Sequence, residues 1–178
     1  MTRIQALLLG GRSGVGKTTV AWELSHQLTE SAVPHALLDG DLLCQAHPAP
    51  PHDPHRTHLT ELNLSALWRN FQALGHTNLI YTNTLCVLPE AAPMFHRTLG
   101  PNAVLTRILL TATDDTTRTR LTSRELGSNL SRELANSTAK SRRLQARTPA
   151  DALHIATDNR SVPALAREIL AATGWPSA

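Results

Sequence analysis

One glycine-rich segment near the N-terminus constrains the fold more than any other feature of this sequence. Residues 11–18 read GRSGVGKT and match the pattern GxxxxGK[ST] in full. The segment follows a short apolar run, residues 4–9, and precedes residues 18–28, in which apolar side chains recur at helical spacing. The chain is therefore predicted to open with a buried strand, a tight loop and a helix.

The loop at residues 11–18 has the composition of a phosphate-binding site. Its glycines let successive backbone N–H groups point at an anion, and the helix that follows adds the positive end of its dipole. Lys17 is expected to reach the β- and γ-phosphates of a nucleoside triphosphate, and the Thr18 hydroxyl to bind Mg²⁺. A chance glycine-rich turn is the alternative, which the flanking strand and helix disfavour. The predicted nucleotide contacts are Gly11, Arg12, Ser13, Gly14, Val15, Gly16, Lys17, Thr18 and Thr19.

The charge balance supports an anionic ligand. The formal net charge is +3, and the 17 basic residues include only two lysines, Lys17 and Lys140. A lysine at position 17 places a compact ammonium where a point charge is needed. The arginines are spread along the chain with few aromatic residues between them, so nucleic acid is not an expected partner. Cys44 and Cys86 lie in different segments and predict neither a disulfide framework nor a zinc site.

Strands and helices alternate through the rest of the chain. After the loop, the pattern predicts strands at 35–38, 78–84, 103–110 and 152–157, and helices at 59–74, 89–99, 116–126, 130–145 and 163–173. This alternation predicts an α/β fold: a P-loop NTPase three-layer αβα sandwich with a five-stranded parallel sheet. We expect one domain, 1–178, with a helical lid at about 118–146.

An acidic pair follows the second predicted strand. The sequence has no guanine-reading NKxD pattern, which favours ATP, and the third strand ends YTNT without the carboxylate of an ordinary Walker B motif. Instead, Asp39 and Asp41 stand at the end of the second strand. A carboxylate beside a phosphate loop can orient an attacking hydroxyl and accept its proton. Asp39 is the predicted catalytic base and Asp41 a second acceptor contact, although either one could instead cap the following turn, and the sequence leaves open which is the base.

With LDGD at 38–41 the sequence resembles the P-loop small-molecule kinases, in particular the adenylylsulfate kinase, shikimate kinase and chloramphenicol phosphotransferase group. The resemblance implies that the two carboxylates hold the acceptor, assist magnesium or take the hydroxyl proton. It also implies a lid in which one arginine packs on adenine and another neutralises the transferring phosphoryl group. Arg120 and Arg124 are neighbours on one helix face and match these roles, Arg124 as the catalytic one. A solvated helix paired with nearby glutamates is the alternative, and Arg160 is a further nucleotide candidate.

The acceptor-reading residues are expected in two segments. The loop 47–58 contains four histidines and four prolines, and Arg56 is its best anion contact. Metal binding there is not predicted, because prolines interrupt the run. Thr82, Asn83 and Thr84 end the third strand and should face the cleft, where open α/β sheets bind ligands.

The predicted function is an ATP-dependent kinase that transfers the γ-phosphoryl group to a hydroxyl of a small polar acceptor. Alternatives are a nucleotide-dependent regulatory ATPase and a kinase that acts on a nucleic-acid end. The apolar run 4–9 is too short to span a membrane and no cleavage site follows it. We therefore expect a cytoplasmic protein, monomer or homodimer, with no membrane partner.

Overall fold

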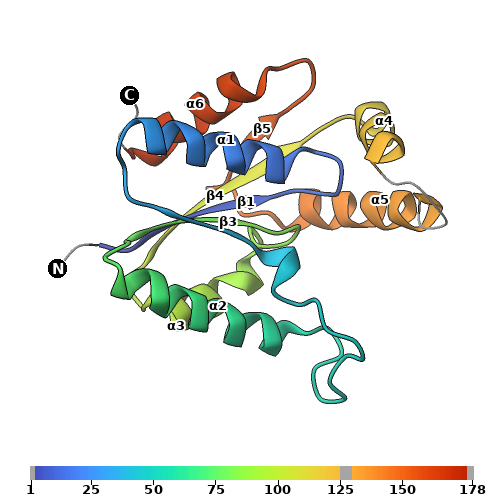
Figure 1. Cartoon of the computed structure of the whole chain (residues 1–178). Coiled ribbons are helices and arrows are strands. Elements are labelled where there is room, and N and C mark those ends of the chain that lie inside the picture. Colours follow the sequence, from blue (N-terminus) through green and yellow to red (C-terminus); the bar gives the residue numbers. More distant parts are fainter. Residues whose placement is uncertain (1–2, 125–129, 176–178) are drawn as a thin grey trace.

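The structure, a computed structural model, describes residues 3–124 and 130–175. Its centre is a sheet of five parallel strands in the order β2-β3-β1-β4-β5 (Figure 1). The strands are β1 (Gln5–Gly10), β2 (Ala36–Asp39), β3 (Asn78–Thr82), β4 (Val104–Thr111) and β5 (Leu153–Ala156). The predicted five-stranded parallel sheet is confirmed.

Helices cover both faces of the sheet. They are α1 (Lys17–Glu30), α2 (Thr57–Ala73), α3 (Ala92–Leu99), α4 (Asp114–Arg124), α5 (Leu130–Arg147) and α6 (Val162–Thr173), with short 3-10 turns η1 (Gly40–Leu42) and η2 (Pro89–Ala91). α1 and α6 pack together on one face, and α2 and α3 on the other (Figure 1). This is the predicted three-layer αβα sandwich. Among the described residues, no helix is long and apolar enough to cross a membrane.

The first strand is buried on both of its faces, which explains its continuous apolar run. Leu8 packs in one cluster with Trp68 and Phe95, on the side of α2 and α3. Leu7 and Leu9 pack on the other side, against α1 and α6. A parallel strand covered by helices on both faces needs apolar residues at every position rather than at alternate ones.

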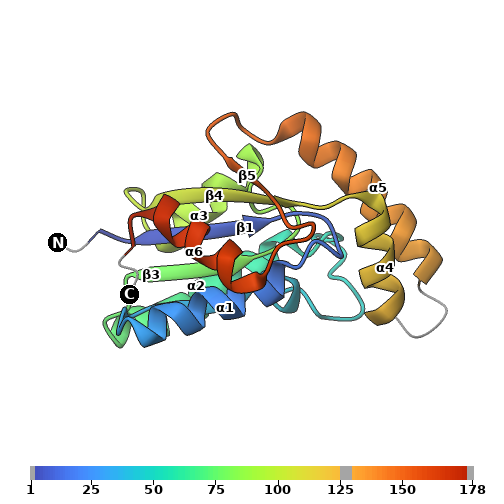
Figure 2. The same ribbon diagram turned by 90° about the horizontal axis from the view of Figure 1, so that it is seen from above.

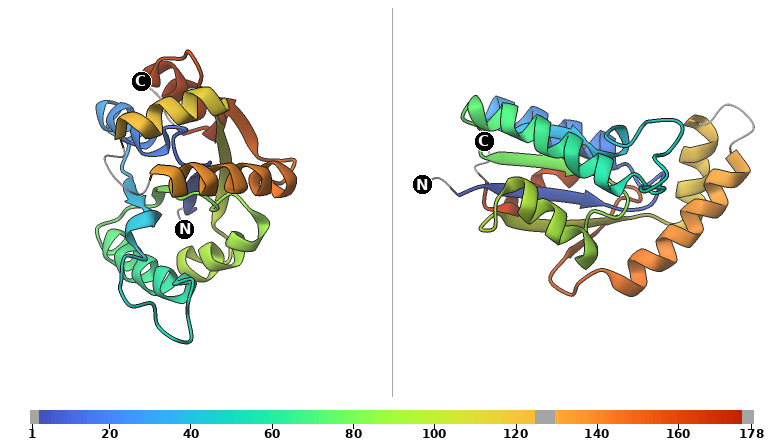
Figure 3. Two further views of the ribbon diagram at one scale, coloured as in Figure 1. Left: turned by 90° about the vertical axis from the view of Figure 1, so that its right-hand side faces the viewer. Right: turned by 90° about the horizontal axis from the view of Figure 1, so that it is seen from below.

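The register of the strands brings their carboxyl ends to one edge. Asp39 at the end of β2 pairs with Thr82 of β3, and Thr82 pairs with Leu9 of β1. The β1–α1 loop, η1 and the end of β3 therefore meet at the same edge, which is where doubly wound sheets bind ligands. Helices α4 and α5 extend beyond that edge as a pair, in the region of the predicted lid (Figures 2 and 3).

Candidate active site

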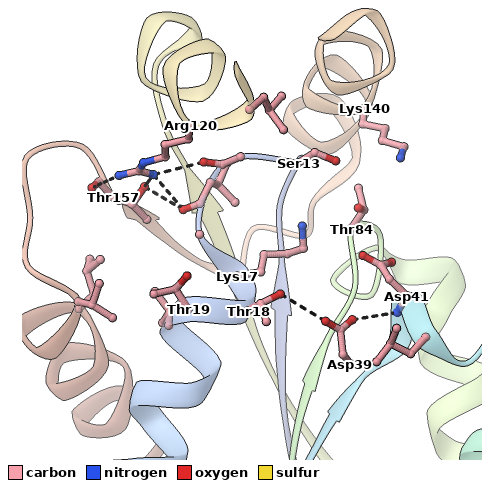
Figure 4. A pocket seen from close by; sticks show the side chains of 18 of the residues that line it. Ser13, Lys17, Thr18, Thr19, Asp39, Asp41, Thr84, Arg120, Lys140 and Thr157 are labelled. Atoms are coloured by element: carbon pink, nitrogen blue, oxygen red, sulfur yellow. Dashed lines mark hydrogen bonds between the residues drawn. The ribbon is translucent and has the colours of Figure 1, made fainter. Parts of the chain in front are cut away.

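A cleft of about 800 Å³ opens at the carboxyl edge of the sheet, between the phosphate loop, η1 and helices α4 and α5 (Figure 4). Its wall combines residues from six separate parts of the chain. They are Ser13, Gly14, Val15, Gly16, Lys17, Thr18, Thr19, Val20, Asp39, Asp41, Leu42, Cys44, Gln45, Thr84, Arg120, Leu121, Lys140, Thr157, Arg160, Val162 and Leu165. Most of the predicted loop residues line it, but Gly11 and Arg12 do not.

The phosphate loop has a backbone that other residues would not adopt easily. Gly14 and Gly16 have φ of 88° and 97°, in the left-handed region that favours glycine. Gly16 precedes the first turn of α1 and no side chain caps that turn, so its N–H groups are left for a ligand. An uncapped helix start beside a buried lysine fits the phosphates of a nucleotide.

Lys17 rises from the start of α1 into the cleft (Figure 4). Its side chain is buried, and Nζ donates to the backbone oxygen of Arg12 at 3.3 Å. Burial lowers the pKa of Lys17, and the nearby carboxylate of Asp41 opposes this shift. The ammonium is therefore poorly hydrated and ready to exchange its weak backbone contact for a phosphate oxygen.

The side chain of Arg12 points away from the cleft. Its Nη1 donates to Oδ1 of Asp114 at 2.5 Å and its Nη2 to the backbone oxygen of Ala112 at 2.8 Å. It therefore fastens α4 to the phosphate loop, and no contact of its guanidinium with a nucleotide follows from this geometry.

Arg120 joins three parts of the site. Its Nη1 donates to the backbone oxygens of Gly14 and Val15, both at 3.3 Å, and to Oγ1 of Thr157 at 3.0 Å. Its Nη2 donates to the backbone oxygen of Thr157 at 3.3 Å. The guanidinium thus holds the phosphate loop, α4 and the end of β5 together while still lining the cleft. The side chain of Arg124 lies outside the described residues, so its predicted role stays a prediction.

Thr18 and Asp39 approach each other at the foot of the cleft (Figure 4). Oγ1 of Thr18 donates to Oδ2 of Asp39 at 3.3 Å, and Oδ1 of Asp39 accepts from the backbone N–H of Asp41 at 3.0 Å. Asp39 therefore also caps η1, which is the alternative role that the sequence left open for one of the two carboxylates. A hydroxyl and a carboxylate side by side are the hard oxygen donors that suit Mg²⁺. Within the described ranges no cluster of three or more His, Cys, Asp or Glu side chains forms a separate metal site.

Asp41 lies across the cleft from the phosphate loop. Its Oδ1 accepts a hydrogen bond from Nδ2 of Asn83 at 2.7 Å, while Oδ1 of Asn83 accepts from the backbone of Leu85 at 3.0 Å. The surrounding cleft wall desolvates the carboxyl and raises the pKa of Asp41, and Lys17 opposes this shift. Asn83 therefore acts on the site through Asp41 and does not itself line the cleft.

Two predicted acceptor residues lie elsewhere. Thr82 is buried within β3 and does not face the cleft, whereas Thr84, two residues later, does. The strand stops at Thr82 because the next residue, Asn83, bonds to Leu85 and turns the chain. Arg56 is also absent from the cleft wall: its Nε donates to the backbone oxygen of Ala46 at 2.8 Å. Arg160 does line the cleft, and it pairs with Glu168 of α6.

Lys140 is a charged cleft residue that was not predicted from the sequence; Leu42, Cys44, Gln45 and Thr157 are further lining residues that were not predicted. It projects from α5 toward the cleft above Thr84 (Figure 4). One turn earlier, Oγ of Ser137 donates to the backbone oxygen of Ser13 at 3.2 Å and docks α5 on the phosphate loop. Both lysines of the chain thus line one cleft. Their rarity among 17 basic residues was the signal that could have found the second one.

Comparisons with known proteins agree with this description. A family model for adenylylsulphate kinase matches residues 3–47, which include the phosphate loop and the Asp39–Asp41 pair. No curated protein sequence matches the chain.

Solved structures resemble almost the whole chain. A tunicamycin resistance protein of Deinococcus radiodurans has a TM-score of 0.68 at 19% identity and covers 99% of both chains. The APS kinase of Mycobacterium tuberculosis, solved with AMPPNP and APS, has a TM-score of 0.58 at 19% identity and covers 96% of this chain and 98% of its own. A shikimate kinase of Acinetobacter baumannii, solved with shikimate, has a TM-score of 0.53 at 18% identity and covers 95% and 92%. The fold is that of the P-loop small-molecule kinases, and the predicted resemblance is confirmed.

Proposed function

We propose that this chain is a kinase that transfers the γ-phosphoryl group of ATP to a hydroxyl group of a small polar acceptor. The observation that carries the proposal is the meeting of a phosphate loop and an acidic pair in one cleft, through the hydrogen bond from Thr18 to Asp39. Phosphoryl transfer needs positioning and charge stabilisation more than covalent chemistry. The cleft offers both, and the fold of P-loop small-molecule kinases supports the assignment.

The nucleotide would bind along the phosphate loop. The first-turn N–H groups of α1 and the ammonium of Lys17 suit its β- and γ-phosphates. Arg120, Val162 and Leu165 line the cleft beyond the loop and suit the nucleoside. Lys140 adds a cation from the lid on the far side of the transferred group, which is the role that the sequence assigned to Arg124.

Thr18 and Asp39 are the residues that would hold Mg²⁺. When bound, the ion supplies neutralisation of the charge on the phosphate oxygens. Thr18 would offer its hydroxyl to the ion from the end of the phosphate loop. Asp39 would offer a carboxylate whose orientation is held by the backbone N–H of Asp41 in η1.

Asp41 is our candidate for the base. Both oxygens of Asp39 are engaged, with Thr18 and with the backbone of Asp41. Among the described residues, Asp41 has one carboxylate oxygen bonded to Asn83 and the other without a hydrogen-bond partner. Its raised pKa also brings the carboxylate closer to the strength that a general base needs. In the transfer, Asp41 would take the proton of the acceptor hydroxyl as its oxygen bonds to the γ-phosphorus. The bond between that phosphorus and the β–γ bridging oxygen would break, and ADP would leave.

The test is ADP release from Mg-ATP, with and without a panel of hydroxyl compounds. The panel comprises polyols, nucleosides, adenylylsulfate, phenicols and aminoglycosides, and Lys17→Ala serves as the blank. Stimulation by one compound well above the basal rate, absent in the blank, supports the kinase. A flat response with tight ATP binding that Lys17→Ala removes would instead indicate a nucleotide-dependent switch.

A further inference from the structure

The two ends of the cleft differ in side-chain chemistry. The end near β5 carries Arg120 beside Thr157 (Figure 4). Arg160, three residues after Thr157 in the chain, also lines the cleft. The other end, near η1, is formed by Asp41, Leu42, Cys44, Gln45 and Thr84. If the nucleoside takes the first end, the acceptor takes the second.

In the described part of the chain, no arginine lines the second end. Planar guanidinium groups are the usual ligands for carboxylates, sulfates and phosphates, because they donate two parallel hydrogen bonds. Arg56, the candidate of the proline-rich loop, is tied to the backbone oxygen of Ala46 and lies outside the cleft wall. An anionic acceptor would therefore meet Asp41 without a matching arginine.

The charges at this end already have partners. Asp41 faces Lys17 and Lys140 across the cleft, and the positive charge of each lysine favours the charged form of the Asp41 carboxylate. Asp39 is engaged by Thr18 and would face Mg²⁺. Neither an extra anion nor an extra cation on the acceptor is needed to balance this end of the cleft.

Neutral polar groups remain available there. Nε2 of Gln45 donates to the backbone oxygen of Asp41 at 2.8 Å, which leaves its Oε1 as an acceptor. The hydroxyl of Thr84, a residue only 6% exposed, makes no hydrogen bond to any described residue. Leu42 also lines this cleft, is 71% exposed and offers an apolar surface. Hydroxyl groups match the first two, and the C–H face of a ring matches the third.

We infer that the acceptor is an uncharged polyhydroxylated molecule, of the sugar or cyclic polyol class, held by Thr84, Gln45 and Asp41 against Leu42. The inference rests on the proposed function, since it concerns the acceptor half of the same cleft. It sets the chain apart from kinases of this fold that act on acids.

The experiment compares matched pairs that differ in one charge: glucitol with gluconate, and methyl shikimate with shikimate. Kanamycin serves as a cationic acceptor. Binding is measured by calorimetry on the full chain with Mg-AMPPNP, and transfer by ADP release with Mg-ATP. The neutral member of each pair should bind and react about tenfold better, because the anion would approach the like charge of Asp41 with no arginine of the described residues at this end to pair with it.

Three variants sharpen the comparison. Thr84→Val should weaken the neutral members about tenfold by removing a hydroxyl that pairs with theirs. Gln45→Arg should shift the preference toward gluconate and shikimate. Arg56→Ala is the control and should leave all constants unchanged, because its guanidinium is bound to the backbone outside the cleft.

The two proposals fail in different ways. A preference for gluconate, shikimate or kanamycin overturns the proposal of an uncharged acceptor, and so does a failure of both neutral compounds to bind. Transfer of phosphate to an anionic compound would still support the proposed kinase function. Binding of a neutral compound without ADP release overturns the kinase while the acceptor class stands.

Discussion

The hydroxyl of Thr18 lies 3.3 Å from Oδ2 of Asp39 and joins the first turn of α1 to the last residue of β2. The contact exists because β1 and β2 are parallel strands whose carboxyl ends reach the same edge of the sheet. It places two hard oxygen donors together beside the phosphate loop, which is the arrangement from which a magnesium prediction follows.

Replacing either member of this pair should weaken magnesium binding. Thr18→Val and Asp39→Asn should each raise the Mg²⁺ concentration for half-maximal binding of a fluorescent ATP analogue about 10- to 100-fold. Thr18→Ser keeps the hydroxyl and serves as the matched control, with a magnesium dependence near that of the wild type. An unchanged magnesium titration in Asp39→Asn would remove Asp39 from the metal site.

Asp41→Asn should separate transfer from nucleotide binding. Loss of the base is expected to lower acceptor-dependent ADP release about 10²- to 10⁴-fold. The Kd for Mg-ATP should stay nearly unchanged, because Asp41 belongs to η1 and its carboxylate accepts from Asn83 rather than from the phosphate loop. The informative comparison is with Asp39→Asn under saturating Mg²⁺. Retained transfer in Asp41→Asn and lost transfer in Asp39→Asn would return the base to Asp39, where the sequence first placed it.

Much of the site was predictable because it is local or follows from the sheet. The phosphate loop is one continuous motif, and Asp39 and Asp41 stand directly after a strand, so the rule that parallel strands end together brings them to the loop. Thr82 shows where this reasoning stops. The sequence run 78–84 reads as strand throughout, but the strand ends at Thr82, and the backbone of Leu85 donates to Asn83 in the turn that follows. Of the three polar residues predicted to face the cleft, Thr84 lines it, whereas Thr82 is buried in the strand and Asn83 bonds to Asp41.

The long side chains were harder to place. Arg12 and Arg56 both looked like ligand contacts, but each can reach a backbone oxygen within the protein and does so. Lys140 is more than 120 residues from Lys17 along the chain, and only the docking of α5 through Ser137 brings it to the cleft. Local patterns predict which residues end a strand; they do not predict which partner a flexible cation chooses.

Arg120→Ala should loosen the phosphate loop. It removes hydrogen bonds from one guanidinium to Gly14, Val15 and Thr157, so the free energy of unfolding should fall by about 1–3 kcal/mol. The Kd for Mg-ATP should rise as well, because the loop is less well ordered before binding. Arg118→Ala, an exposed position on the same helix, is the control in urea unfolding and nucleotide titration. Equal effects of the two variants would contradict a bracing role for Arg120.

Gly40→Ala should displace Asp39 and Asp41, because Gly40 lies between them in the chain and packs closely against Tyr81. A Cβ at this position would lie 2.1 Å from Oη of Tyr81 and 2.9 Å from the backbone oxygen of Thr82, and Tyr81 is only 1% exposed. Overpacking of this kind costs about 1–3 kcal/mol in unfolding free energy. Because η1 must move to relieve it, acceptor-dependent activity should fall further than stability alone explains. Gly75→Ala, where φ is 88° and no described atom lies within 4 Å of the added Cβ, measures the cost of backbone strain without a clash and should leave acceptor-dependent activity per folded molecule unchanged. An active, fully stable Gly40→Ala variant would show that η1 tolerates displacement.

The two thiols should react very differently with iodoacetamide. Burial raises the pKa of Cys86 to about 12, and its Sγ donates to the backbone oxygen of Asn83 at 3.2 Å. At pH 8 only about one Cys86 thiol in ten thousand is then ionised, and the thiolate is the reactive form. Cys44 is half-buried and lines the acceptor end of the cleft.

Mass spectrometry of the folded protein should therefore find one alkylated cysteine, and of the urea-unfolded protein two. Cys44→Ser should abolish the reaction of the folded protein, and Cys86→Ser should leave it intact. Raising the pH from 8 to 9 should still not recruit Cys86, since a buried thiol with so high a pKa stays protonated. Alkylation of Cys86 in the folded state would mean that the turn after β3, which orients Asn83 toward Asp41, opens far more often than its hydrogen bonds imply.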